Sequence, residues 1–180
     1  MPYPKAVNYI LFQIGWFACV LGAANNLSLV GIMLALLVVF VYLYTSTTRA
    51  ADALALLIIT VVGYAWDSLL VQLGVFTYND SYFDGLAPLW IAAIWAIFAT
   101  TLNSSLAWLQ GRYWLAFALG GVFGPIAYFS ASKLGAVVIL QAPQALLMQA
   151  IAWSILMPAM LLCIKYTQRT ISVPSKEICE

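Results

Sequence analysis

The sequence predicts an all-α integral membrane protein: a bundle of six transmembrane helices with its N- and C-termini on the cytoplasmic side. Two observations predict this fold. Of the 180 residues, 65% are apolar and 7% are charged, and the mean hydropathy is +1.00, well outside the range of soluble domains. The apolar residues also form six segments of the length, about 20 residues, that a helix needs to cross a bilayer core of roughly 30 Å.

The six predicted spans are separated by short breaks that are polar or contain glycine. They cover residues 6–24, 27–44, 53–73, 87–109, 113–131 and 145–164. We assign residues 1–166 to one six-helix transmembrane domain and residues 167–180 to a short cytoplasmic tail. The apolar run 134–140, inside the break 132–143, is too short to cross alone, and it is open to interpretation as a loop, a re-entrant segment or an extension of the fifth helix.

The orientation follows from the basic residues, because cytoplasmic loops retain lysine and arginine. With six spans, Lys133 falls on the outer face, and all other basic residues fall on the opposite face: Lys5, Arg49, Arg112, Lys165, Arg169 and Lys176. Six spans also permit a three-plus-three inverted repeat. No internal sequence match supports one.

Composition also excludes several functions. The chain has no histidine, which removes histidine-based metal and haem sites, and its three cysteines show no metal-binding spacing. We therefore predict no metal and no cofactor. Seven basic and six acidic residues are too few and too scattered for a nucleic-acid surface, so no nucleic-acid partner is expected.

Asp67 is the carboxylate predicted to lie within a span, about 9 Å below the outer end of the third helix. An ionised carboxylate there is costly unless it is paired or hydrogen-bonded. We expect an ion pair with Lys133 and polar neighbours in Tyr64, Gln72 and Gln149. Two interpretations stay open: Asp67 is an acid/base or proton-carrying residue and so the candidate catalytic group, or it is half of a structural ion pair.

Two asparagines and two prolines complete the candidate residues. Asn8 in the first span and Asn103 near the end of the fourth lie on faces rich in small residues, and these faces are expected to pack together with both amides in the bundle interior. Pro125 in the fifth span and Pro158 in the sixth each remove a helical hydrogen bond and predict a kink. Interhelical packing is the favoured role for all four residues, and the alternatives are a substrate site at the asparagines and a gate at the prolines.

The chain also resembles a known family over nearly its whole length, up to about Lys165. The resemblance is carried by Asn8-Tyr9, Phe12-Gln13 and Trp16, then Trp66-Asp67-Ser68, Pro88-Leu89-Trp90, Phe98-Ala99-Thr100-Thr101-Leu102-Asn103 and Gly124-Pro125-Ile126-Ala127-Tyr128. These motifs are similar to those of a bacterial family of small inner-membrane proteins, domain-of-unknown-function family 2878. The resemblance implies no activity, and it implies only a weak link to membrane fatty-acid modification and oxidative-stress response.

A fainter resemblance, to small membrane carotenoid cyclases, rests on Asp67, the run Gly74-Val75-Phe76-Thr77-Tyr78 and the proline that opens the next helix. Those enzymes carry paired acidic residues just after that proline. Here Leu89, Trp90 and Ile91 follow Pro88. Asp67 alone would have to supply the acid.

Three functions are therefore kept, and whether the protein is an enzyme stays open. The first is a lipid-associated inner-membrane protein that assists modification of an acyl or isoprenoid substrate, since apolar walls with few polar groups suit such a ligand. The second is a small proton-coupled transporter. The third is a structural or assembly subunit, with a membrane-protein partner or a second copy of the chain packed against faces of small residues.

Overall fold

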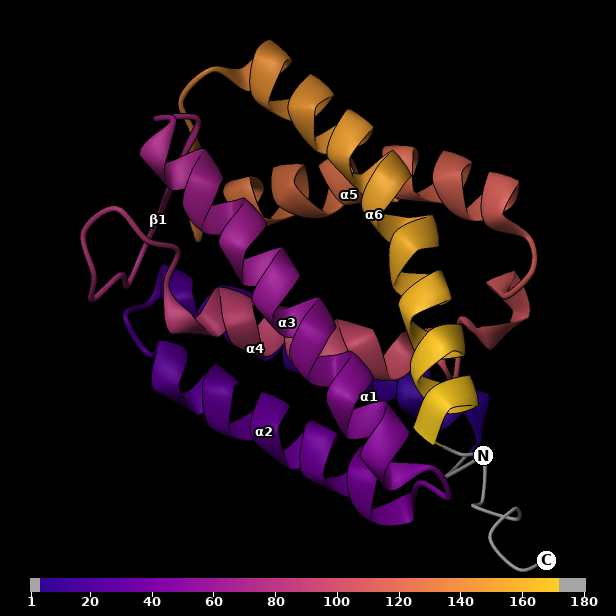
Figure 1. The fold of residues 1–180 in the computed structure, drawn as a ribbon. Helices are drawn as coiled ribbons and strands as arrows, with labels where there is room; N and C mark the ends of the chain where they lie inside the picture. Colours follow the sequence, from indigo (N-terminus) through magenta and orange to yellow (C-terminus); the bar gives the residue numbers. More distant parts are fainter. Residues whose placement is uncertain (1–3, 172–180) are drawn as a thin grey trace, which may run out of the picture.

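The computed structural model describes residues 4–171 of the chain. Within that range there are six α-helices, one 3₁₀ helix and two short strands (Figure 1). The helices are α1 (Lys5–Ala24), α2 (Ser28–Thr45), α3 (Arg49–Gln72), α4 (Leu89–Leu102), α5 (Tyr113–Lys133) and α6 (Ala142–Ile171). The 3₁₀ helix η1 covers Ala107–Leu109, and the strands are β1 (Phe76–Tyr78) and β2 (Val137–Ile139).

Five of the described helices, all except α4, are long and apolar enough to cross a membrane. This confirms the prediction of an all-helical membrane protein. The fourth differs from its prediction. Helix α4 has 14 residues, or about 21 Å, and the chain then continues through turns and η1 to residue 109. Helix α6 is longer than predicted and continues to Ile171, into the predicted cytoplasmic tail. The rest of that tail, which includes Lys176, lies outside the described residues.

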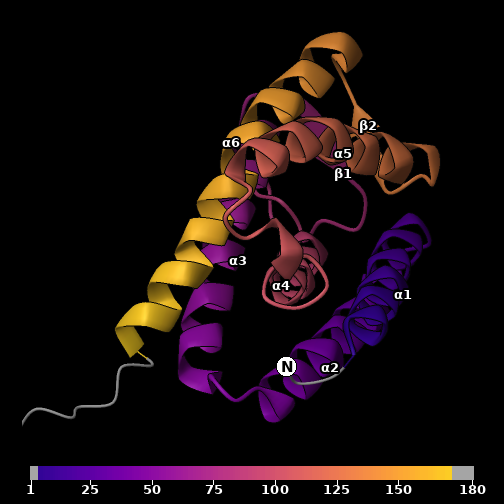
Figure 2. The ribbon, with the colours of Figure 1, turned by 90° about the vertical axis from the view of Figure 1, so that its right-hand side faces the viewer.

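Helix α4 lies at the centre of the bundle. It contacts α1, α2, α3 and α6, and Figure 2 shows it nearly end-on among the other helices. Its side chains are buried on several faces, with Ile97 and Leu102 fully enclosed. Helices α1 and α2 form a hairpin beside it, in which Gly31 lies directly against the backbone of Cys19.

Helix α3 ends on a glycine. Gly74 has a φ of +65°, which glycine adopts without strain. Its N–H donates to the Val71 carbonyl at 3.0 Å, and the N–H of Val75 donates to the Leu70 carbonyl at 3.0 Å. These two bonds form a Schellman motif, which satisfies the last carbonyls of the helix and turns the chain into β1.

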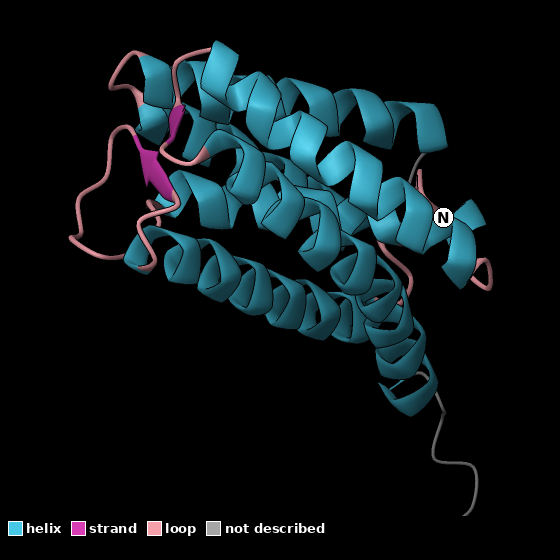
Figure 3. Ribbon diagram, turned by 90° about the horizontal axis from the view of Figure 1, so that it is seen from above, coloured by secondary structure: helices cyan, strands magenta, loops and turns pink. Residues whose placement is uncertain are grey.

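Helix α5 ends in the same way. Gly135 has a φ of +85°, its N–H donates to the Ser132 carbonyl at 3.1 Å, and the N–H of Ala136 donates to the Ala131 carbonyl at 3.1 Å. The chain then enters β2, which pairs antiparallel with β1 at one end of the helices (Figure 3). The segment 134–140 is therefore a helix cap and a strand, and its backbone is satisfied by β1. It does not extend α5.

The two helix–strand units form a short internal repeat, which is distinct from the three-plus-three inverted repeat that six spans permit. Leu73-Gly74 ends α3 and Leu134-Gly135 ends α5, and each pair leads directly into a strand. The units are packed differently, however. Helix α3 packs against both α4 and α6, whereas α5 packs along α6 and is separated from α4 by a cavity.

The loop between β1 and α4 is fixed to the start of α2. Leu27, at the N-cap position of α2, has no side chain that could cap the helix. Asp80 supplies the cap from a distance: its Oδ2 accepts the backbone N–H of Ser28 at 2.9 Å. Hydrogen bonds from Ser28 lower the pKa of the Asp80 carboxyl.

Candidate functional site

Asp67 is fully buried, and its carboxylate is the centre of a hydrogen-bonded group. Its Oδ1 accepts the hydroxyl of Tyr78 at 2.7 Å and that of Tyr128 at 2.8 Å, and its Oδ2 accepts the indole N–H of Trp95 at 2.7 Å. The donors come from β1, α5 and α4 and converge on α3. Three charge-assisted bonds compensate for the loss of water around the carboxylate. We call Asp67, Tyr78, Trp95 and Tyr128 the Asp67 cluster.

The predicted ion pair between Asp67 and Lys133 is replaced by this cluster. Lys133 is exposed at the end of α5, and its Nζ lies over the ring of Phe129, 5.1 Å from the centroid. Burying a neutral hydroxyl or indole N–H beside the carboxylate costs less desolvation free energy than burying the ammonium group of a lysine. The long lysine side chain lets its ammonium group stay near water instead. The prediction placed both residues in the same half of the bundle but chose the wrong partner.

The other predicted neighbours of Asp67 bond elsewhere. The hydroxyl of Tyr64 donates to the Ala87 carbonyl at 2.7 Å, and Gln72 is exposed. Gln149 is buried, and its Oε1 accepts the indole N–H of Trp66 at 3.0 Å. None of the three bonds to Asp67 itself, but the Gln149 side chain interacts with the Tyr128 hydroxyl and so lies beside the Asp67 cluster.

Stacked tryptophans adjoin the cluster. The rings of Trp95 and Trp153 are 4.8 Å apart and inclined by 13°, and Phe98 packs edge-on against Trp153. Two glycines make room for these rings: Gly63 of α3 lies against Trp95, and Gly124 of α5 lies against Trp153. The small residues therefore admit large rings between helices.

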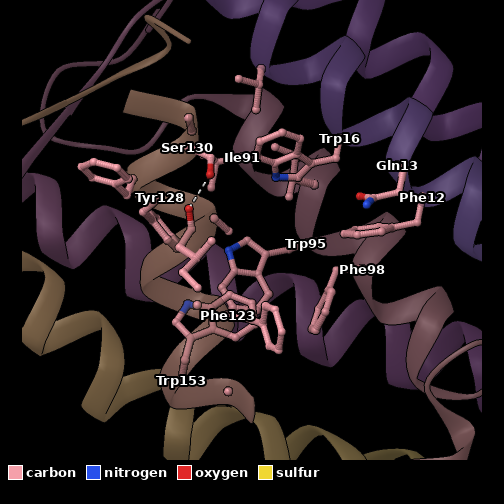
Figure 4. Close-up of a pocket in the computed structure, with 18 of the residues that line it drawn as sticks. Phe12, Gln13, Trp16, Ile91, Trp95, Phe98, Phe123, Tyr128, Ser130 and Trp153 are labelled. Atoms are coloured by element: carbon pink, nitrogen blue, oxygen red, sulfur yellow. Dashed lines mark hydrogen bonds between the residues drawn. The ribbon is translucent and has the colours of Figure 1, made fainter. Parts of the chain in front are cut away.

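A cavity of about 780 Å³ lies between α1, α4 and α5 and reaches the Asp67 cluster. Most of its lining is apolar or aromatic. In Figure 4, Gln13 and Trp16 of α1 lie on the other side of the cavity from Tyr128, and Phe12 of α1 lies beside Phe98 of α4, where the two rings are 6.0 Å apart. A cavity with mostly apolar walls and a few polar groups is typical of sites for small apolar ligands.

The rim of this cavity is formed by exposed side chains of two helices. Phe17 of α1 is 47% exposed, and Phe123 and Phe129 of α5 are 60% and 47% exposed. In a membrane protein such side chains face lipid. We call the space the lateral cavity, because it opens between α1 and α5 on the side of the bundle.

One polar atom in the cavity wall is without a partner among the described residues. The indole nitrogen of Trp153 is buried and makes no hydrogen bond within residues 4–171, although it lies near the Tyr128 hydroxyl. Buried donors are satisfied in most folded proteins. The wall therefore offers a hydrogen-bond donor beside the Asp67 cluster.

A second polar network lies at the opposite end of the bundle. Asp52, at the start of α3, is 2% exposed and accepts hydrogen bonds from Ser46, Thr48 and Asn103. Asn103 was predicted to lie near Asn8 in the interior, but the two amides bond to different partners.

Asn8 donates to Thr100 at 3.2 Å and accepts the hydroxyl of Ser105 at 2.7 Å. Helix α1 does pack on α4, but Gly15 lies against the large side chain of Ile97 and not against a face of small residues, and Cys19 packs on Gly31 of α2. Asn8 thus joins α1 to α4 and to the turns that follow it, as interhelical packing requires.

The prolines and the acidic residues add no further site. Pro125 and Pro158 lie inside helices that continue past them. Within residues 4–171, no three cysteine, aspartate or glutamate side chains gather as metal ligands would.

Sequence reasoning missed Tyr78, Trp95 and Tyr128. Tyr78 and Trp95 are only 8% and 3% exposed. Tyr128 could have been found, because it continues the face of Gly120 and Gly124 at helical spacing. The burial of Tyr78 depends on the pairing of β1 with β2, and the burial of Trp95 depends on the central position of α4. The sequence contains no local pattern that predicts either feature.

Comparison with known proteins agrees with the family expected from the motifs. No curated protein and no solved structure matches the chain. A family described as Protein of unknown function (DUF2878) matches residues 5–159. The matched range contains every residue of the Asp67 cluster and extends from the start of α1 into α6. The chain belongs to this DUF2878 family.

Proposed function

We propose that the protein binds the hydrocarbon chain of a membrane lipid, acyl or isoprenoid, in the lateral cavity and presents it to the Asp67 cluster. The observation that carries this proposal is the position of the cavity: it reaches a buried polar cluster and is rimmed by side chains that face lipid. An apolar chain could enter between α1 and α5 without crossing water.

The proposal includes a topology of six crossings with both termini cytoplasmic, in the bacterial inner membrane that the family resemblance implies. Helix α4, η1 and the turns between them would make the fourth crossing, shielded from lipid by their neighbours. The basic residues support this orientation. Lys5, Arg49 and Arg112 lie at the starts of α1, α3 and α5, and Lys165 and Arg169 lie near the end of α6.

The chemistry of the cluster suits an apolar ligand. Asp67 is itself covered, so it acts through the groups that it holds. Because the hydroxyl of Tyr78 donates to the carboxylate, its oxygen lone pairs remain available as acceptors beside the cavity, whereas the Tyr128 oxygen is approached by the side chains of Gln149 and Trp153. The indole N–H of Trp153 adds a donor. Such a site can orient an alkene, hydroxyl or carbonyl group on the chain.

Lipid binding is favoured over the two alternatives. A proton-coupled transporter needs a water-filled path to its titrating carboxylate, whereas the lateral cavity is lined mostly by apolar side chains. A purely structural subunit needs no cavity beside the cluster. The aromatic walls support a ligand-binding role instead.

The lipid and pigment profile of cells lacking the protein tests the proposal. Wild type is expected to restore an altered profile. Ala127→Trp, which places a large ring in the lateral cavity, should fail to restore it, and Val122→Trp, on the lipid-exposed side of the same helix, should succeed. A profile that deletion leaves unchanged would overturn the proposed function.

A further inference from the structure

We propose that Lys133 binds the phosphate of the membrane lipid whose chain occupies the lateral cavity, and so sets the depth at which that chain meets the Asp67 cluster. The inference rests on the proposed function and adds to it a head-group class and a register along the chain.

Lys133 is placed at the right point for this role. It is the last residue of α5, is exposed, and lines the same cavity as Tyr128. Its ammonium group lies 5.1 Å from the centroid of the Phe129 ring, which also lines the cavity. A cation over a single exposed ring is held weakly, and the three N–H donors of the group stay available to an anion.

The distribution of charge points to an anionic partner. With the proposed topology, Lys133 is the basic residue on the outer side among residues 4–171, against the usual preference for cytoplasmic lysine. Lysine is a good point-charge partner for phosphate. In the proposed topology α5 is a membrane-spanning helix that ends on the outer side, so its last residue comes near the lipid phosphates there.

The geometry also fixes a register. Tyr128 precedes Lys133 by five residues, a rise of about 7.5 Å along α5. The cavity continues along α5 as far as Leu119, about 21 Å from Lys133. A phosphate held at the rim therefore leaves the chain to run inward, and a fixed part of that chain lies beside Tyr128 and Trp95.

Photolabelling of the full-length protein tests this assignment. The protein is held in dodecyl maltoside, which has no phosphate, with phosphatidic acid or diacylglycerol carrying the same chain with a mid-chain diazirine. We expect phosphatidic acid to label the wall around Tyr128 and Trp95. Lys133→Gln should lower that labelling about fivefold, toward the level of diacylglycerol. Lys133→Arg should retain it.

Arg112→Gln is the matched control, because it removes the same charge from the opposite end of α5, outside the cavity. Inorganic phosphate, which lacks the chain, should not displace the label. Equal labelling of wild type and Lys133→Gln by phosphatidic acid would overturn the role of Lys133 and leave lipid binding intact. Failure of both lipids to label the cavity would overturn the proposed function as well.

Discussion

The Tyr128 hydroxyl donates a 2.8 Å hydrogen bond to Oδ1 of Asp67, and the two residues hold equivalent positions in a repeated helix–strand unit. Asp67 precedes Leu73 by six residues, and Tyr128 precedes Leu134 by six. The repeat thus brings two corresponding side chains together. One is the acceptor and the other the donor, so the pair needs no cation.

Asp67→Asn is expected to destabilise the protein by about 1 to 3 kcal/mol. The amide oxygen can still accept the tyrosine hydroxyls, but the amide NH₂ then faces the indole N–H of Trp95, and two donors meet. Thermal unfolding in detergent measures the loss. Asp84→Asn, on the exposed loop between β1 and α4, should leave the melting temperature unchanged. An equally stable Asp67→Asn protein would contradict the role of the carboxylate as the shared acceptor.

Tyr128→Phe and Asp67→Asn should be non-additive, because both remove the same hydrogen bond. The double variant is expected to lose less stability than the sum of the single variants. A double-mutant cycle of unfolding free energies measures this coupling. Strict additivity would mean that the two side chains do not interact in the membrane protein.

Much of the fold follows from the sequence, and the reasons are physical. Long apolar runs fix where helices form, since lipid leaves backbone groups no other partner. The Leu-Gly pairs at 73 and 134 mark helix ends. The strand pairing is long-range, however, because Thr77 lies opposite Val138, and two three-residue strands carry no period that distinguishes them from loops.

The candidate site was predicted in part. Burial of Asp67 followed from its place in an apolar span, but its partners did not. Charge complementarity suggested Lys133, whereas neutral donors from three other elements fill the site. Asp52 was missed because it lies at a predicted span boundary, where an acidic residue at a helix start is ordinary.

Gly63→Ala and Gly124→Ala should each lower stability by about 1 to 3 kcal/mol, because the added methyl group collides with Trp95 or Trp153. The rings would have to separate, and the near-ultraviolet circular dichroism of the stacked indoles should weaken. Val61→Ala, on the lipid-exposed face of α3, is the control. Unaltered spectra for both glycine variants would show that the rings are not packed as described.

Asp52→Ala is expected to cost about 1 to 3 kcal/mol, because the hydroxyls of Ser46 and Thr48 and the amide of Asn103 lose a shared acceptor. Unfolding in detergent measures the change, with Asp84→Ala for comparison. If the protein keeps its full stability without the Asp52 carboxylate, the network at that end does not hold the start of α3.

Asp80→Asn should lower stability by about 0.5 kcal/mol at neutral pH, and the difference from wild type should shrink as the pH falls below about 3.9. The folded pKa of Asp80 is lowered by its bonds from Ser28, so the stabilisation is present above the unfolded value of about 3.9. It is lost as the pH falls through the lowered folded value. Asparagine tolerates the positive φ of 55° at this position, which isolates the charge. A difference that grows on acidification would refute the assignment.

The lipid retained by the purified protein tests the central claim most directly, and native mass spectrometry measures it. Wild type and Val122→Trp are expected to appear in the spectrum with a bound lipid. Ala127→Trp is expected to appear without one. Equal lipid retention by Ala127→Trp and wild type, with both proteins folded, would contradict the claim that the lateral cavity holds a lipid chain.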